Sequence, residues 1–128
     1  MPNTLVATRL GWITDPAAVI DAVHSALREA LKIPAGDRTL RLIEHPASHF
    51  AIPPGRGEKF TLVEVTMFSG RSLGAKRALY QAIVRNLAAL GVPALDIKIT
   101  LSETGAENWG LRGGLPASEI DLGFKIDV

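Results

Sequence analysis

The sequence of 128 residues contains no cysteine, which excludes disulfide bonds, zinc ribbons and thiol catalysis. The formal net charge is only +1, no basic stripe indicates a nucleic-acid-binding surface, and there is no acidic tail. No apolar run approaches the ~20 residues that a membrane-spanning helix needs, and the first residues lack the charged and apolar regions of a signal peptide. We therefore expect a soluble cytoplasmic protein that binds neither nucleic acid nor membranes.

The residues that are present are typical of a folded protein. Hydrophobic residues make up 47% of the chain and charged residues 21%, which is the balance of a globular rather than a disordered sequence. A chain of this length usually forms one domain, and it buries roughly two thirds of the surface of its unfolded state. We therefore predict a single domain over residues 1–128.

Short segments of the first half recur in the same order in the second half. The clearest pair is Ala30–Asp37 and Ala89–Asp96, and the letters Thr-Leu-Val occur at both 4–6 and 61–63. These matches predict an internal repeat. The predicted division is a first copy at 1–45, a second copy at 59–104 and a C-terminal extension at 105–128.

Each copy is predicted to fold as strand, helix and strand. Capping residues and apolar residues at helical spacing predict one helix that begins after Asp15 and another that begins after Ser72. Runs of strand-forming residues predict four strands, at 2–9, 39–44, 62–68 and 97–101. Because one helix connects the two strands of each copy, these strands should run parallel.

The last residues alternate between apolar and other side chains, which predicts a further strand over 122–128 that pairs within the sheet or with a neighbouring subunit. The predicted class is therefore α+β. We expect a duplicated β-α-β sheet of four strands, with two helices on one face, plus this C-terminal strand.

Most residue types that carry chemistry occur here without a supporting pattern. His45 and His49 flank Pro46, so they do not share a helix face, and we interpret them as exposed loop residues rather than metal ligands. His24 lies at the edge of an apolar helical stripe, which favours a structural role. Gly113–Gly114 has no strand–helix context and indicates a turn rather than a phosphate-binding loop.

Pro2 is the first candidate for catalysis. Removal of Met1 leaves a secondary amine at the start of a predicted strand. Apolar burial or a nearby cation lowers the pKa of such an amine toward the value that a general base needs at neutral pH. The alternative is that Pro2 is incidental.

Two further candidates lie in loops. Arg71 falls between a predicted strand and the N-terminus of the second helix, where a bidentate carboxylate site is plausible, although a solvated loop arginine is the alternative. Trp109, followed by Arg112 in a glycine-rich segment, indicates the wall of a small pocket. The alternative is a turn whose tryptophan is anchored in the core.

Taken in order, these features resemble the tautomerase superfamily, and most closely its malonate semialdehyde decarboxylase branch. The resemblance covers essentially the whole chain, and the segments that carry it are Pro2 after Met1, Ile33–Arg38, Gly70–Ser72 and Glu107–Gly114. It implies a homotrimer of subunits with two β-α-β units each, with active sites near the amino-terminal prolines at subunit boundaries. It also implies that no cofactor is required.

The resemblance assigns roles to individual residues. Pro2 matches the catalytic proline, Asp37 the aspartate that assists it, Arg71 the arginine that binds the substrate carboxylate, and Trp109 a pocket wall. Arg112 joins the candidate substrate-binding residues through its proximity to Trp109 in the sequence.

Two departures from the family pattern concern the type of reaction. Ser69 stands where the decarboxylase has a second arginine, and the tyrosine and late glutamate of the dehalogenase branch have no match, since Tyr80 lies inside a predicted helix. We therefore expect a keto–enol tautomerase that acts on a small 2-oxo or enol carboxylate. The alternatives are a decarboxylase or hydratase of a small 3-oxo or unsaturated acid, and a non-catalytic oligomeric binding module.

Overall fold

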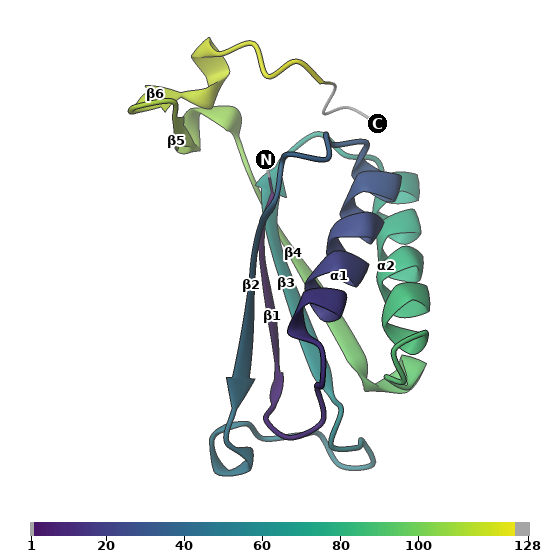
Figure 1. Cartoon of the computed structure of the whole chain (residues 1–128). Coiled ribbons are helices and arrows are strands. Elements are labelled where there is room, and N and C mark those ends of the chain that lie inside the picture. The colour runs from purple at the N-terminus through teal and green to yellow at the C-terminus, as the bar shows by residue number, and fades with distance from the viewer. Residues whose placement is uncertain (1, 125–128) are drawn as a thin grey trace.

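The computed structural model describes residues 2–124. Each of two long helices connects two of the four strands of the main sheet, and a short hairpin follows (Figure 1). In chain order the elements are β1 (Asn3–Arg9), α1 (Pro16–Leu31), β2 (Thr39–His45), β3 (Thr61–Phe68), α2 (Leu73–Ala88), β4 (Ile97–Thr104), β5 (Gly110–Leu111) and β6 (Leu115–Pro116).

Both helices begin at the capping residues that the sequence predicts. The Asp15 carboxylate accepts a hydrogen bond from the N–H of Ala18 at 3.3 Å, and the Ser72 hydroxyl accepts one from the N–H of Ala75 at 3.0 Å. Each bond satisfies one of the N–H groups that a helix leaves unpaired in its first turn. Helix α1 ends at Leu31, and its capping residue Lys32 has a left-handed φ of 58°.

The strands of the main sheet are arranged in the order β2-β1-β3-β4. Within each β-α-β unit the strands are parallel, as predicted, whereas β1 and β3 join the two units as an antiparallel pair. Helices α1 and α2 lie side by side on one face of the sheet (Figure 1), which confirms the predicted layering.

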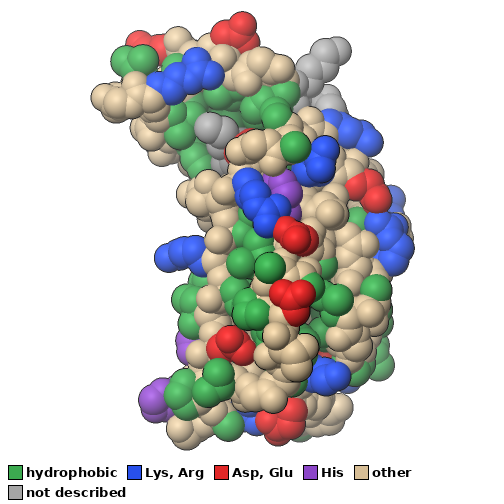
Figure 2. All heavy atoms as spheres, in the orientation of Figure 1, with side chains coloured by type: hydrophobic (Ala, Val, Ile, Leu, Met, Phe, Trp, Pro, Cys, Tyr) green, Lys and Arg blue, Asp and Glu red, His purple; other side chains and the backbone are tan. Residues whose placement is uncertain are grey.

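The main core lies between this helical layer and the sheet. Alternate residues of the central strands point into it, and Val6 and Val63 pair across the β1–β3 ladder with no exposed surface. The helices contribute large buried side chains that include Leu27, Leu79 and Ile83. In Figure 2, basic and acidic side chains are interspersed over the visible face rather than gathered in a patch of one sign.

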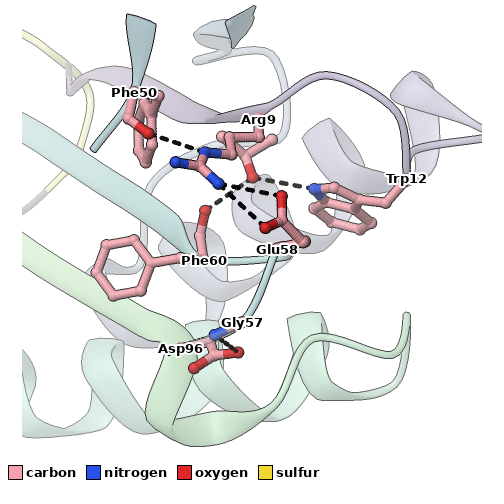
Figure 3. A network of polar contacts seen from close by, with 8 residues as sticks. Arg9, Trp12, Phe50, Gly57, Glu58, Phe60 and Asp96 are labelled. Carbon is pink, nitrogen blue, oxygen red and sulfur yellow. Dashed lines mark hydrogen bonds and ion pairs between the residues drawn. The ribbon is translucent and has the colours of Figure 1, made fainter. Parts of the chain in front are cut away.

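Residues 46–60, the segment between the two β-α-β units, are held against the C-terminal end of β1. Arg9 donates through Nε to the Phe50 carbonyl at 2.8 Å and through Nη1 to both carboxylate oxygens of Glu58 at 3.1 Å (Figure 3). Nearby, the Thr8 hydroxyl donates to the Phe60 carbonyl at 2.8 Å and accepts a bond from the Trp12 indole at 3.0 Å. This segment is therefore fastened to the end of β1 at several points.

The C-terminal part of the chain differs from the prediction. The hairpin β5–β6 was not expected, and Leu122–Phe124, the described part of the predicted terminal strand, is not a strand. The reason is local: Gly123 has a φ of +76° and its N–H donates to the Asp121 carboxylate at 2.9 Å, which forms a turn. Residues 125–128 of that predicted strand lie outside the described residues.

Candidate active site

Pro2 is buried and lies directly before β1. The next residue, Asn3, pairs with Thr39 at the start of β2 on one side and with Thr66 near the end of β3 on the other. The start of β1 is therefore flanked by the turn that precedes β2 and by the turn that follows β3. These two turns carry Asp37 and Arg71, so the sheet register brings three predicted site residues to one end of the sheet.

Asp37 lies in the turn between α1 and β2. Its N–H donates to the Pro34 carbonyl at 3.1 Å, and its side chain is half-buried. The neighbouring Arg38 forms an ion pair with Asp21 of α1. The turn is thus attached to the helix that precedes it.

Arg71 lies in the turn between β3 and α2, and its side chain is only 6% exposed. Its Nη1 donates to the carbonyl of Leu31, the last residue of α1, at 2.7 Å. A cation at this position satisfies a carbonyl that the helix leaves unpaired and interacts favourably with the helix dipole. Arg71 is therefore not the solvated loop arginine that the sequence left open as an alternative.

Trp109 follows β4 and packs on the end of β3. Its ring meets that of Phe68 edge to face, with centroids 4.9 Å apart, and the side chain is 8% exposed. Together with Ala117 these two residues form a small second core that attaches the C-terminal hairpin to the sheet. This position fits the anchoring role that the sequence left open beside the role of pocket wall.

Arg112 lies in the turn of the β5–β6 hairpin and is exposed. It has a left-handed φ of 48°, and its Nη2 donates to the Asp121 carbonyl at 3.4 Å. The contacts found among the described residues do not connect Arg112 with Pro2, Asp37 or Arg71. Figure 2 shows the surface hollowed between this hairpin and the body of the molecule.

Three buried polar atoms at this end of the sheet have no hydrogen-bond partner within residues 2–124. They are Thr4 Oγ1, His24 Nδ1 and Trp109 Nε1. Buried polar groups are rarely left unsatisfied, and such atoms gather where a ligand or a water supplies the missing partner. Thr4 is not among the predicted site residues, although its spacing from Pro2 in a strand places both on the same face.

The described part of the chain contains no helix that is long and apolar enough to cross a membrane. Within the same residues, no three histidine or acidic side chains come together in a way that would hold a metal ion.

Comparison with known proteins identifies the family. A family model described as a tautomerase enzyme matches residues 37–112, which is more than half of the chain. The chain belongs to this tautomerase family. The matched segment includes Asp37 and Arg71.

Two tautomerases match part of the sequence. A probable tautomerase of Ralstonia nicotianae is 34% identical over 53 residues, which are 41% of this chain and 76% of that protein. The 2-hydroxymuconate tautomerase of Comamonas testosteroni is 31% identical over 51 residues, which are 39% of this chain and 81% of that protein. Both relatives are thus about half as long as this chain.

Solved structures with the tautomerase fold match nearly the whole chain. The structure of FG41 malonate semialdehyde decarboxylase inhibited by 3-bromopropiolate has a TM-score of 0.80 and 29% identity, and the match covers 92% of this chain and 97% of that one. Native fused 4-OT has a TM-score of 0.81 at 21% identity over 92% of this chain and 98% of that one, which shows the shared fold.

The packing of Trp109 leads to a stability prediction. Trp109→Ala should lower the free energy of unfolding by about 3–5 kcal/mol, because it removes a large buried ring, whereas Trp109→Phe should cost less because a ring still packs on Phe68. Urea unfolding at a fixed protein concentration measures both. If Trp109→Ala leaves stability unchanged and raises only the KM of an enol substrate, the residue is a pocket wall instead.

Proposed function

We propose that this protein is a cofactor-independent keto–enol tautomerase that acts on a small 2-oxo or enol carboxylate. The observation that carries the proposal is the convergence of Pro2, Asp37 and Arg71 at one end of the sheet. Membership of the tautomerase family and the partial match to a 2-hydroxymuconate tautomerase support it.

Pro2 is the proposed general base. Once Met1 is removed, its nitrogen is a secondary amine, and burial favours the neutral form that accepts a proton. In the proposed reaction this nitrogen takes the proton from the enol oxygen, and the resulting ammonium gives a proton to the carbon as the carbonyl forms. The net result moves one proton from oxygen to carbon, and no cofactor takes part.

Arg71 is the proposed anchor for the substrate carboxylate. Its bond to the Leu31 carbonyl holds the guanidinium at the site, and guanidinium groups bind carboxylates in a charge-assisted, often bidentate geometry. Asp37 is proposed to orient the amine and to polarise the reacting group. Trp109 and Arg112 remain candidates for contact with the distal part of the substrate.

Decarboxylation of a small 3-oxo acid is the second candidate function. The similarity to FG41 malonate semialdehyde decarboxylase favours it. The family resemblance places a second arginine at the position of Ser69, which here offers only an exposed hydroxyl. A neutral hydrogen bond is roughly half as strong as a charge-assisted one, so charge that develops during decarboxylation is stabilised less.

We also propose that the protein forms a homotrimer. Fused 4-OT structures that share the fold are described as symmetric and asymmetric trimers. In the described sheet, β2 and β4 are edge strands, and Ile43, at the edge strand β2, is 38% exposed. Sheet edges and exposed apolar side chains of this kind are commonly covered by a neighbouring subunit.

The role of Pro2 is tested by comparing protein with and without Met1. Met-free protein, verified by intact mass, should ketonise phenylenolpyruvate or 2-hydroxymuconate in an ultraviolet assay. Protein that retains Met1 should be inactive, because the Pro2 nitrogen is then an amide without basicity. Equal rates for the two forms would remove Pro2 as the base, and the absence of turnover in both would favour the binding-module alternative.

The preference for tautomerisation is tested at Ser69. Ser69→Arg should raise the decarboxylation of malonate semialdehyde by about tenfold, since the missing charge is worth on the order of 1–2 kcal/mol. Arg71→Ala should abolish both activities. Wild-type decarboxylation as fast as the best enol ketonisation would contradict the proposed main activity.

The assembly is tested by light scattering. A homotrimer should have three times the 13.7 kDa mass of one chain. A monomer mass at micromolar concentration would contradict the proposed homotrimer.

A further inference from the structure

His24 is a buried histidine next to the turn that carries Asp37. Only 4% of its surface is exposed, and its Nε2 lies 3.1 Å from the carbonyl oxygen of Ala35. A carbonyl oxygen can only accept a hydrogen bond, so Nε2 donates. The other ring nitrogen, Nδ1, is buried and has no partner among the described residues.

The Ala35 carbonyl belongs to the central peptide of the turn Pro34–Asp37. The turn is closed by the bond from the Asp37 N–H to the Pro34 carbonyl at 3.1 Å, so Ala35 and Gly36 are its two middle residues. The peptide between the middle residues of a β-turn distinguishes type I from type II, because it points in opposite directions in the two types. The bond from His24 therefore fixes the orientation of this peptide.

Gly36 permits the other orientation of this peptide. In this structure Gly36 has no positive φ. A type II turn requires a positive φ at this position, and glycine adopts a positive φ at little cost. Without the bond from His24, a flip of this peptide costs Gly36 little. We expect such a flip to loosen the backbone at Asp37, the residue whose N–H closes the turn.

Residues on both sides of Asp37 in the sequence are bonded to α1. His24 holds Ala35 on one side, and Asp21 pairs with Arg38 on the other. The ion pair is exposed, since 61% of the Asp21 side chain and 42% of the Arg38 side chain are accessible, so solvent weakens it. The bond from His24 is part-buried, and its donor side chain is only 4% exposed, so it is the better-protected constraint on the turn.

We propose that His24 is a positioning residue for Asp37: it holds the Ala35–Gly36 peptide in one orientation and thereby steadies Asp37 at the end of the sheet where Pro2 lies. The proposal rests on the catalytic role of Asp37 proposed above. His24 acts through the turn and does not contact the substrate in this scheme.

The first test compares two substitutions of His24. His24→Leu removes the donor and should lower kcat for enol ketonisation by about 3- to 10-fold, roughly the effect of losing one hydrogen bond. KM should change by less than about twofold, because Arg71, the proposed carboxylate anchor, is untouched. His24→Gln retains an N–H donor and should recover most of kcat.

The second test uses Gly36. A Cβ at this position meets no atom within 4 Å, so Gly36→Ala should be tolerated and leave wild-type activity unchanged. Because alanine disfavours the positive φ of a type II turn, His24→Leu/Gly36→Ala should regain most of the lost kcat. A loss of activity caused only by a damaged core would not be reversed in this way.

A control and a readout independent of activity complete the design. Asn86→Leu removes a comparable bond, from the Asn86 side chain to the Ala22 carbonyl at 2.9 Å, and should leave kcat unchanged. Hydrogen exchange measured by mass spectrometry should show faster exchange at residues 34–38 in His24→Leu but not in Asn86→Leu.

The outcomes separate this proposal from the proposed function. If the wild type has no activity but exchange at 34–38 rises in His24→Leu, the enzyme assignment fails while the constraint on the turn stands. The positioning role is overturned if the wild type is active and His24→Leu matches it in both kcat and exchange. It is also overturned if Gly36→Ala restores nothing or Asn86→Leu is equally impaired.

Discussion

The antiparallel pairing of β1 with β3 is the constraint on which the rest of the site depends. Each β-α-β unit is internally parallel, so only this pair decides how the two units face each other. Its register puts the chain start beside the end of β3, and therefore Pro2 beside the turn of Arg71. A slip by one residue would turn Val6 and Val63 out of the core, so the same apolar packing that stabilises the sheet also aligns the site.

Arg71 adds a second connection between the two units. Burial of a guanidinium is costly unless its donors are satisfied, and the Leu31 carbonyl at the end of α1 provides an acceptor. The carbonyl in turn needs a donor, because the helix ends there. Each group therefore satisfies the other, and the bond holds the end of α1 against the start of α2 near the proposed site residue Asp37.

The sequence predicted the elements whose signals are local. The caps at Asp15 and Ser72 and the apolar periodicity placed both helices and all four strands of the main sheet nearly as observed. The structure shows no strand over 122–124, the described part of the predicted terminal strand, because alternation alone does not reveal the turn at Gly123. The burial of Arg71 and the bond from His24 to Ala35 were not predictable, because they depend on partners that only the fold brings together.

The two β-α-β units differ at the position of the proposed base. The 57-residue shift that aligns 4–6 with 61–63 in the predicted repeat also aligns Pro2 with Lys59, and Lys59 lines a second hollow at the opposite end of the sheet, together with Trp12 and Asp15 among others. Repetition within one chain can copy a strand, a turn and a helix cap, but it cannot copy a chain terminus. The backbone nitrogen of Lys59 is an amide, so this second hollow has no counterpart of the secondary amine, whatever its shape.

The adjoining segment instead fastens the two units, since Arg9 and Glu58 form their ion pair there (Figure 3). Under the proposed function, one proline-based site therefore serves two β-α-β units, and the opposite end of the sheet holds the segment that joins them.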